Sequence, residues 1–454
     1  MIAKFPYGKV PFWLLVIAVA SMVTLLLTRR ARPPRPDLIL VTFSSAHFAA
    51  YKNAIPRFEQ QHNVKVQIQQ ASWTALQSRL QNAILAGTEV PDLVEVFARS
   101  LGFFTRGPVE DIGLLDLTDR LRDEGLSDRL VPSRLSLWSE RGRVYAIPHD
   151  VHPIMLAYRR DLVEQLGIDV RALDTWDKFV KEGQRITGDL NGDGTVDRYM
   201  IDLPYVFNWG LFSLLLQNDG QIFGSDGRIA FNSPAVAETF LWYVRQTQGP
   251  KRIAWDSGTG QSQMKAASDG LVIFHFMPDW RSYVFQTDLP SLAGKMALMP
   301  MPAWRPGGRR TSVWGGTGLV MMKQTKQPKL AWELAKFLYF DGSELGKRFA
   351  ATNIIPPVMD AWDLPEFKKQ NPYYSNQAVG SSYAALARET PPVYSSAVDE
   401  LAQNKLGEAY SRVVEHYKSQ GEAGLPERIR EELTRAADYV QRVQARNARL
   451  STPQ

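Results

Sequence analysis

An acidic loop in the middle of the chain carries side chains at the spacing of a calcium-binding loop. Residues 189–197 read DLNGDGTVD, which follows the pattern D-x-N-x-D-G with glycine at the sixth position for the sharp turn. The twelfth position is Met200, where such loops place a bidentate glutamate. We therefore predict weak, structural Ca²⁺ binding; the alternative is a turn held by its own side-chain hydrogen bonds. The predicted ligands are Asp189, Asn191, Asp193, Thr195 and Asp197.

Few other residues of the chain could bind a metal ion or act as a nucleophile. The 454 residues include no cysteine and 6 histidines. This excludes a disulfide framework, thiolate metal sites, a cysteine nucleophile and a lipid anchor on cysteine. His149 and His152 form one HxxH pair, a metal-ligand spacing, but no further ligand lies near them in sequence. Hydrogen bonding to a bound molecule is the favoured interpretation of this pair, and no cofactor is required.

The N-terminus carries an apolar segment. Residues 11–27 read PFWLLVIAVASMVTLLL, without a charge, which is at the short end for a bilayer span. Two interpretations remain open for residues 11–28: a transmembrane helix that anchors the protein, or a signal segment cut after the small residues at 18–20. The apolar run continues beyond residue 20, which favours the anchor. We expect a short tail over residues 1–10 and an Arg/Pro linker over residues 29–37.

The next hundred residues alternate between strand and helix patterns. Residues 38–43 (LILVTF), 64–68 (VKVQI) and 92–96 (DLVEV) are predicted strands, and residues 49–61 and 74–85 carry apolar side chains at helical spacing. This order predicts a doubly wound α/β unit, in which ligands bind at the carboxyl ends of the strands. The side chains expected there are Ser44, Ser45, His47, Phe97 and Arg99. A charged helix with an apolar stripe is predicted over residues 426–449.

Several segments, in order, resemble one known family. They are FEQQHNVKV (58–66), AGTEVPDLV (86–94), VYAIP (144–148), LAYRRDLVEQLGI (156–168), TWDKF (175–179), VWGGTGLVM (313–321) and AWELAKFL (331–338). Over about residues 38–448 the chain resembles the carbohydrate-binding, maltose-binding-protein-like family of extracellular solute-binding proteins of ABC importers.

The resemblance implies a two-lobed α/β fold of the periplasmic-binding-protein type with the ligand in the cleft between the lobes. Lobe 1 would comprise residues 38–149 and 315–362, and lobe 2 residues 150–314 and 363–454. The implied function is capture of a mono- or oligosaccharide and its delivery to permease subunits, without catalysis. The protein would act as a monomer on the outer face of the cytoplasmic membrane, periplasmic or extracellular, held by the N-terminal helix or cleaved and secreted.

Aromatic rings can cover the C–H faces of a sugar, and planar polar groups can pair with its hydroxyls. Residues of these types occupy loop positions that match the family's contact regions. In addition to the residues after the first and third strands, the predicted ligand contacts are Trp73, His149, Asp150, His152, Tyr205, Asn208, Trp209, Asp279, Trp280, Trp314, Gly315, Gly316 and Tyr394.

Three other functions remain open. The chain could bind a different solute, such as a polyol phosphate or a polyamine, or serve as a sensor ectodomain. A glycoside hydrolase using Asp150 and Asp279 is a distant alternative, because hydrolysis needs two carboxyl groups at a defined separation. Nucleic acid is not an expected partner. The formal net charge is +6, and the six basic residues that precede residue 37, where there is no acid, account for all of it.

Overall fold

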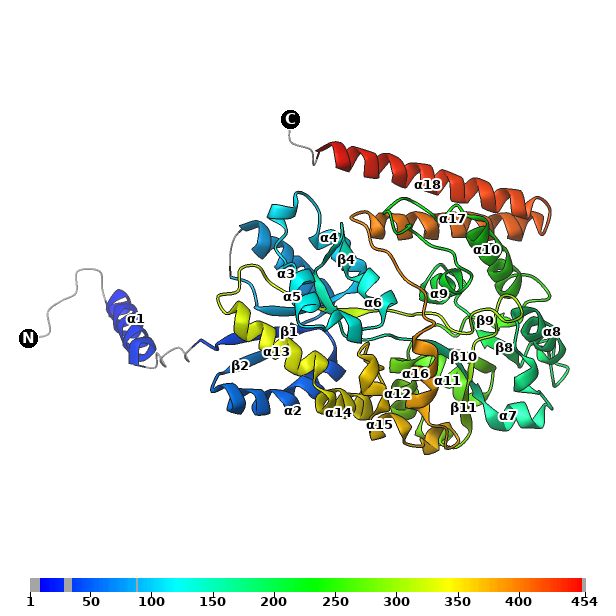
Figure 1. The fold of residues 1–454 in the computed structure, drawn as a ribbon, viewed down its shortest axis with the longest axis horizontal. Helices are drawn as coiled ribbons and strands as arrows, with labels where there is room; N and C mark the ends of the chain where they lie inside the picture. The colour runs from blue at the N-terminus through cyan, green and yellow to red at the C-terminus, as the bar shows by residue number, and fades with distance from the viewer. Residues whose placement is uncertain (1–8, 28–34, 87–88, 451–454) are drawn as a thin grey trace, which may run out of the picture.

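The computed structural model describes residues 9–27, 35–86 and 89–450. Two five-stranded sheets, covered by helices, form its body (Figure 1). We call the first sheet with its helices lobe 1 and the second sheet with its helices lobe 2. The two lobes lie side by side, and the limits predicted for them from the family resemblance stay a prediction.

The sheet of lobe 1 has the strand order β2-β1-β3-β12-β6. Its strands are β1 (Leu38–Thr42), β2 (Val66–Gln70), β3 (Leu93–Phe97), β6 (Ala146–Pro148) and β12 (Thr317–Met321). β1 pairs in parallel with both β2 and β3, whereas β12 pairs antiparallel to β3 and β6. The carboxyl ends of β1, β2 and β3 therefore meet at one edge of the sheet.

Helices α2 (Ser45–His62) and α3 (Trp73–Ala86) follow β1 and β2, so the predicted doubly wound order is confirmed. Helix α2 begins four residues earlier than its apolar spacing predicts. The reason is a capping interaction, because the Ser44 side chain accepts a hydrogen bond from the backbone N–H of His47. Further helices of lobe 1 are α13 (Pro328–Phe340) and α14 (Gly342–Thr352) and the short α4 (Leu101–Phe104), α5 (Thr118–Asp123) and α6 (Pro132–Leu137).

The sheet of lobe 2 has the order β11-β7-β10-β8-β9. Its strands are β7 (Ile154–Arg159), β8 (Tyr199–Asp202), β9 (Ala254–Trp255), β10 (Val272–Pro278) and β11 (Met296–Pro300). β7 and β10 are buried at every residue and almost wholly apolar, as expected for central strands covered on both faces. The helices around this sheet are α7 (Arg160–Gln165), α8 (Trp176–Ile186), α9 (Trp209–Gln217), α10 (Pro234–Thr247), α11 (Gln261–Asp269) and α12 (Asp279–Asp288).

Two segments cross between the sheets. The first, residues 149–153, joins β6 to β7, and the second, residues 313–316, leads into β12. An antiparallel bridge between Pro153 and Val313 holds the crossings side by side. Further elements are the β4–β5 hairpin (Ser139–Glu140, Arg143–Val144) and helices α15 (Pro365–Lys368) and α16 (Val379–Ala387).

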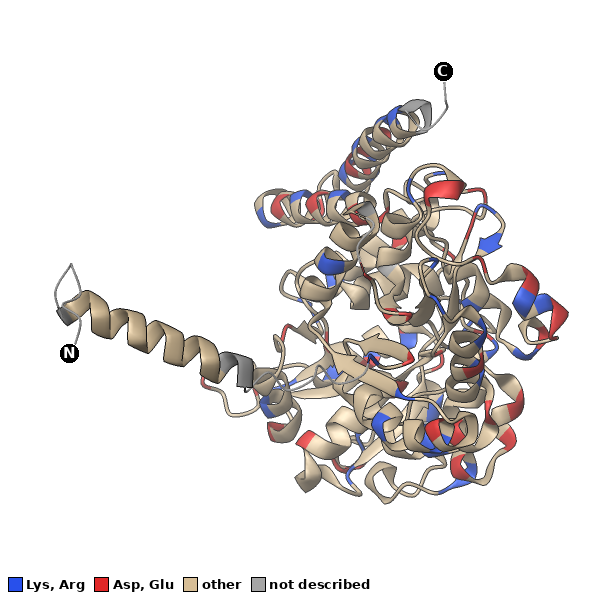
Figure 2. Ribbon diagram, turned by 90° about the vertical axis from the view of Figure 1, so that its left-hand side faces the viewer, with Lys and Arg blue, Asp and Glu red and all other residues tan. Residues whose placement is uncertain are grey.

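Helices α17 (Asp399–Gln420) and α18 (Leu425–Leu450) form an antiparallel pair at the C-terminal end of the described chain (Figure 1). Ile429, Leu433 and Val440 of α18 belong to the apolar core of lobe 2, which confirms the amphipathic helix predicted over residues 426–449. Acidic and basic residues are interspersed along both helices (Figure 2).

Helix α1 (Lys9–Leu27) precedes the body. Its described side chains are exposed, for example Trp13, and no charged residue marks the ribbon beyond its start (Figure 2). None of the helices within the described ranges is both long enough and apolar enough to cross a membrane. Residues 1–8 of the predicted tail and most of the predicted Arg/Pro linker lie outside the described residues, and α1 begins within the predicted tail, at Lys9.

Candidate functional site

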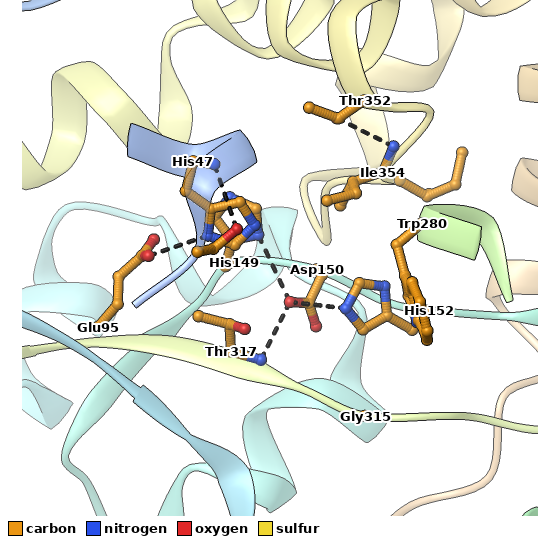
Figure 3. A network of polar contacts seen from close by, with 12 residues as sticks. His47, Glu95, His149, Asp150, His152, Trp280, Gly315, Thr317, Thr352 and Ile354 are labelled. Carbon is orange, nitrogen blue, oxygen red and sulfur yellow. Dashed lines mark hydrogen bonds and ion pairs between the residues drawn. The ribbon is translucent and has the colours of Figure 1, made fainter. Parts of the chain in front are cut away.

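A chain of acidic and imidazole side chains lies at the two crossings (Figure 3). His152 stands between two carboxylates: its Nε2 is 3.0 Å from Asp150 Oδ2, and its Nδ1 is 2.6 Å from Asp279 Oδ1. Asp150 belongs to the first crossing, whereas Asp279 begins α12 at the end of β10 in lobe 2. All three side chains are buried. The imidazole therefore joins the crossing to the lobe 2 sheet.

Groups from lobe 1 and from the second crossing also bind the Asp150 carboxylate. Arg134 Nη2 lies 3.4 Å from Asp150 Oδ1 and donates to the carbonyl of Gly315 at 3.3 Å. The backbone N–H of Thr317 donates to Asp150 Oδ2 at 3.0 Å. His152 and Gly315 both have positive φ, 56° and 94°. These left-handed residues let both crossings turn tightly around Asp150.

The electrostatics favour a charged His152 beside an ionised Asp150. Burial opposes the charge on the imidazole, but Asp150 and Asp279 outweigh it and raise the pKa of His152 to about 9. Burial likewise opposes ionisation of Asp150, yet His152 and His149 hold its pKa well below the usual range. Burial and, after it, the neighbouring His47 lower the pKa of His149 to about 3, so this ring is neutral. A neutral imidazole can accept or donate one hydrogen bond at each ring nitrogen.

Glu95 on β3 is a buried carboxylate with four side-chain donors. Its Oε2 accepts from Thr42 and lies 2.9 Å from His47 Nδ1, and its Oε1 accepts from Tyr51 at 2.5 Å and Tyr339 at 2.7 Å. Burial opposes ionisation, but His47 and the hydrogen bonds lower the pKa of Glu95 well below its usual range. The group is a satisfied charge in the core of lobe 1.

His47, Glu95 and His149 offer nitrogen and oxygen atoms within 4.8 Å of one another, a spacing that could hold a metal ion. Two observations argue against this use. The imidazoles of His47 and His149 are stacked, with centroids 3.8 Å apart and planes at 25°, so their lone pairs run nearly parallel instead of converging. Glu95 is also saturated by its donors. The cluster is better described as a polar brace between α2, β3 and the first crossing.

Three aromatic rings gather where the parallel strands of lobe 1 end. Phe43 stacks on Phe97 at 4.1 Å, and Trp73 meets the two rings edge-on at 5.6 and 5.4 Å. Phe97 keeps 37 % of its surface exposed, a large fraction for a phenylalanine. We call these three residues the aromatic corner. It presents apolar ring surface at the edge where ligands bind to doubly wound sheets.

A groove between the lobes starts at the aromatic corner. Its first cavity, about 270 Å³, is lined from lobe 1 by Trp73, Gln77 and Ser100 and from lobe 2 by Gln403 and Asn404. A second cavity of about 470 Å³ shares Arg106, Ser396 and Ala397 with the first and extends to Arg141 and α18. A small inner cavity of about 20 Å³ shares Asp399 and Gln403 with the first cavity. The three cavities adjoin around residues 396–403.

The structure brings some of the predicted contacts to this groove. Trp73 lines the first cavity, and Trp209 and Tyr394 line the inner one. Trp314 lies beside α9, half-buried, with its ring 3.8 Å from the position that a Cβ on Gly210 would take. Ligand contact of these side chains stays a prediction.

Other predicted contacts have structural partners of their own. Ser44 and Asn208 cap α2 and α9. Ser45 lies exposed in the first turn of α2, and buried Gly316 packs against Arg134. The Tyr205 hydroxyl donates to the carbonyl of Ala254 at 3.4 Å, on lobe 2 away from the aromatic corner. Trp280 follows Asp279, half-buried beside the crossings (Figure 3). The Arg99 side chain lies outside the described part of the structure.

The two aspartates of the hydrolase alternative have other partners. His152 lies between Asp150 and Asp279, and the backbone N–H groups of Thr317 and Ile355 donate to them. Both carboxylates are fully buried. Neither is placed to protonate a glycosidic oxygen in the groove, so their geometry fits a brace between the crossings and not a pair of catalytic acids.

The acidic loop at 189–197 is exposed and folds on its own amides. Asp189 accepts from the backbone N–H of Gly192 and Gly194, both at 2.7 Å, and Asp193 accepts from Thr195 N–H at 2.7 Å. These are the hydrogen bonds of the alternative interpretation, a turn held by its side chains. Calcium binding by Asp189, Asn191, Asp193, Thr195 and Asp197 stays a prediction.

Sequence reasoning missed Phe43, Glu95 and the residues of the groove on α17. Phe43 ends the LILVTF strand and could have been found as the first side chain beyond the sheet edge. Glu95 sits inside an apolar strand, where an acid signals a buried partner. Gln403 and Asn404 carry no local signal, because only the tertiary fold brings α17 beside α3.

Comparisons with known proteins agree with this architecture. The family model for bacterial extracellular solute-binding proteins matches residues 44–344. The chain is 26 % identical to an arabinooligosaccharide-binding protein of Halalkalibacterium halodurans, over 74 % of this chain and 75 % of that protein. It is 27 % identical to the arabinooligosaccharide-binding protein of Bacillus subtilis, over 79 % and 82 %.

The fold is also similar to that of the sugar-binding protein MalE from Xanthomonas citri. The TM-score is 0.73 with 18 % identity, covering 90 % of this chain and 98 % of the other. The two-lobed architecture, the match over more than half of the chain and the groove between the lobes lead to one conclusion. The chain belongs to the family of bacterial extracellular solute-binding proteins.

Proposed function

We propose that this chain is the substrate-binding component of an ABC sugar importer, which captures a carbohydrate between its lobes and delivers it to the permease. The observation that carries the proposal is the aromatic corner at the mouth of a polar groove. Trp73 belongs to both, since its ring meets Phe43 and Phe97 and it lines the first cavity.

The chemistry of the groove suits an uncharged, hydroxyl-rich ligand. Exposed ring surface at Phe97 and Trp73 can cover the C–H face of a sugar. The amide and hydroxyl groups of Gln77, Ser100 and Gln403 can donate to and accept from its hydroxyls. A pocket with apolar rings and a few placed polar groups is the usual form of a small-molecule site.

The size of the groove favours an oligosaccharide. Its adjoining cavities of about 270 and about 470 Å³ together fall in the range that holds drug-sized ligands. The groove is therefore large enough for more than one sugar ring. The two relatives named above as arabinooligosaccharide-binding proteins support a pentose oligosaccharide as the first candidate to test.

A thermal-shift screen of the purified full chain tests the proposal. Mono- and oligosaccharides of arabinose, galactose and glucose are compared with polyamines and glycerol phosphate. A true ligand at a hundredfold excess over its dissociation constant should stabilise the fold by about 2.7 kcal/mol. Stabilisation by a polyamine or a polyol phosphate alone would contradict the sugar proposal and favour the other solute class.

We also propose that residues 11–28 attach the protein to the outer face of the cytoplasmic membrane, as an anchor or as a signal segment before cleavage. The support is the composition of the segment: most of the exposed side chains of α1 are apolar, and residues 11–28 hold no acid. Carbonate extraction of expressing cells and N-terminal sequencing test this. An intact N-terminus on protein in the soluble extract would contradict both forms of attachment.

Weak structural calcium binding at residues 189–197 is a further proposal. The loop glycines Gly192 and Gly194 have positive φ, as sharp turns of such loops require. Isothermal titration with millimolar Ca²⁺ should show heat that the Asp189→Asn variant loses. Identical, flat titrations of both proteins would refute calcium binding and leave the turn interpretation.

A further inference from the structure

The segment between α16 and α17 runs along the seam of the two lobes. It comprises residues 390–398 (TPPVYSSAV), and we call it the strap. Figure 1 shows it as the orange coil that descends from α17 between the lobes. Ser396 and Ala397 of the strap line both larger cavities, and Tyr394 lines the inner one. The strap is therefore a wall of the whole groove.

Lobe 1 touches the strap at several points. The hydroxyls of Ser133 and Thr390 are 3.0 Å apart, and the Ser136 hydroxyl donates to the carbonyl of Val393 at 3.4 Å. Arg106 Nε donates to the carbonyl of Ala397 at 2.9 Å. These contacts join helix α6 and the loop after α4 in lobe 1 to a segment that continues into α17.

Lobe 2 holds the other side of the strap. Gln221 Nε2 donates to the carbonyl of Pro392 at 3.0 Å, and Val398 is buried in the lobe 2 core. Val393 packs against the cores of both lobes. The strap is thus attached to lobe 2 through α17 and presses against lobe 1.

Gly102 of α4 is the tightest point of this contact. A Cβ at Gly102 would lie 2.0 Å from the carbonyl oxygen of Ser396 and 3.1 Å from the backbone nitrogen of Ala397. No side chain could give way, because both opposing atoms belong to the backbone. Gly102 does not have positive φ, so its conformation does not require glycine, and the reason for glycine here is the close approach of the strap.

Tyr394 lies two residues from this contact and lines the inner cavity with Trp209. A ligand that contacts Tyr394 would therefore contact the same short segment that packs against Gly102. Two peptide units therefore separate Tyr394, which lines the inner cavity, from Ser396, which contacts Gly102.

We propose that Gly102 and the strap form a steric gate for lobe closure. Glycine at position 102 lets lobe 1 approach the Ser396 carbonyl closely, and the hydrogen bond from Arg106 to the Ala397 carbonyl stabilises this contact. Any larger residue at 102 holds the lobes apart. The inference rests on the proposed function insofar as closure captures the ligand, but the gate itself can be measured without any ligand.

The test is an interlobe distance in the full chain, purified in mild detergent. The protein has no cysteine, so Ser78→Cys on α3 and Thr434→Cys on α18 give two unique spin-label sites on exposed positions. Pulsed electron paramagnetic resonance without carbohydrate should show longer distances in the Gly102→Ala variant than in the parent. Distances identical to the parent would overturn the gate.

Matched variants distinguish an effect on lobe closure from a general loss of folded structure. Gly188→Ala is the control, because no heavy atom lies within 4 Å of the Cβ it adds, and it should keep the parent distances. Alanine is a better helix former than glycine, so Gly102→Ala should retain its circular dichroism spectrum. Should it fail to fold, Arg106→Ala decides the question: longer distances support the gate, and parent distances contradict it.

Ligand affinity gives an independent readout. If arabinotriose binds the parent, Gly102→Ala should weaken it about 10-fold or more, because overpacking disfavours the closed form. Unchanged affinity together with unchanged distances would refute the gate. Failure of every carbohydrate to bind the parent would count against the proposed function alone, because the distance measurement still judges the gate.

Discussion

His152 Nδ1 lies 2.6 Å from Asp279 Oδ1, a contact that ties the first crossing to the lobe 2 sheet. Burial disfavours the imidazolium, but Asp150 and Asp279 outweigh it and raise the pKa of His152 to about 9. The crossings therefore depend on a positive charge that is retained at neutral pH. This relationship leads to a prediction about stability.

The free energy of unfolding should fall as the pH rises. The folded pKa of His152 lies above the ordinary value of 6.5, so its contribution is complete below pH 6.5 and is lost as the pH rises through 9. The loss amounts to at most about 3 kcal/mol. Urea unfolding between pH 6 and pH 9.5 measures it.

His152→Asn is the matched variant, because asparagine tolerates the positive φ of 56° and does not titrate. It should be less stable than the parent at pH 6 and show a flatter pH dependence. Parallel stability curves for the two proteins would show that His152 does not carry this charge.

The groups around His152 could be predicted singly but not as a network. The family resemblance singled out His149, Asp150 and His152 because they fall at the first crossing between the lobes, and Asp279 because it follows a predicted strand. The sequence predicts a ligand-contacting role for them, whereas in the structure Asp150 and Asp279 bind His152 from two sides. Residues 127 positions apart meet only when β7 and β10 pair, so spacing along the chain carries no signal for this contact.

Strands and helices near the N-terminal end of the body were predictable from periodicity alone, as at β1 and α2. The predicted start of α2 at residue 49 was wrong, because the Ser44 cap lets the helix begin at Ser45. Only part of the groove lining could be predicted from the sequence. Trp73 and Phe97 follow from strand ends, but the α17 wall and the strap depend on long-range packing that no local pattern reports.

Glu95→Gln should destabilise lobe 1. The carboxylate accepts from Thr42, His47, Tyr51 and Tyr339, and a glutamine amide would face one pair of these donors with an N–H group. Breaking a buried charged network of this kind costs about 3–5 kcal/mol. Urea unfolding at pH 7 measures the loss.

Glu89→Gln is the control for this change, because Glu89 is exposed and pairs only with half-exposed Arg35 among the contacts described for it. A surface pair contributes about 0–1 kcal/mol. The parent should also lose stability as the pH falls, since the folded pKa of Glu95 is depressed. Equal stability of Glu95→Gln and Glu89→Gln would argue against a buried, ionised Glu95.

The aromatic corner should determine carbohydrate affinity. Trp73→Ala and Phe97→Ala remove ring surface at the groove, and each should weaken binding about 10-fold or more. Phe337→Ala is the matched control, because this half-buried ring packs on Phe58 beneath Arg57 in lobe 1 and lines none of the described cavities. Equal weakening by all three variants would mean that the loss reflects lobe stability instead of contact.

The most direct measurement is isothermal titration of the full chain with arabinose and galactose oligosaccharides, alongside Trp73→Ala. A binding module for carbohydrate predicts one ligand per chain, saturable heat, a micromolar or tighter dissociation constant and intact sugar after incubation, with much weaker binding by Trp73→Ala. Absence of heat with every carbohydrate, or release of shorter sugars during incubation, would contradict the proposal that this protein captures sugars without catalysis.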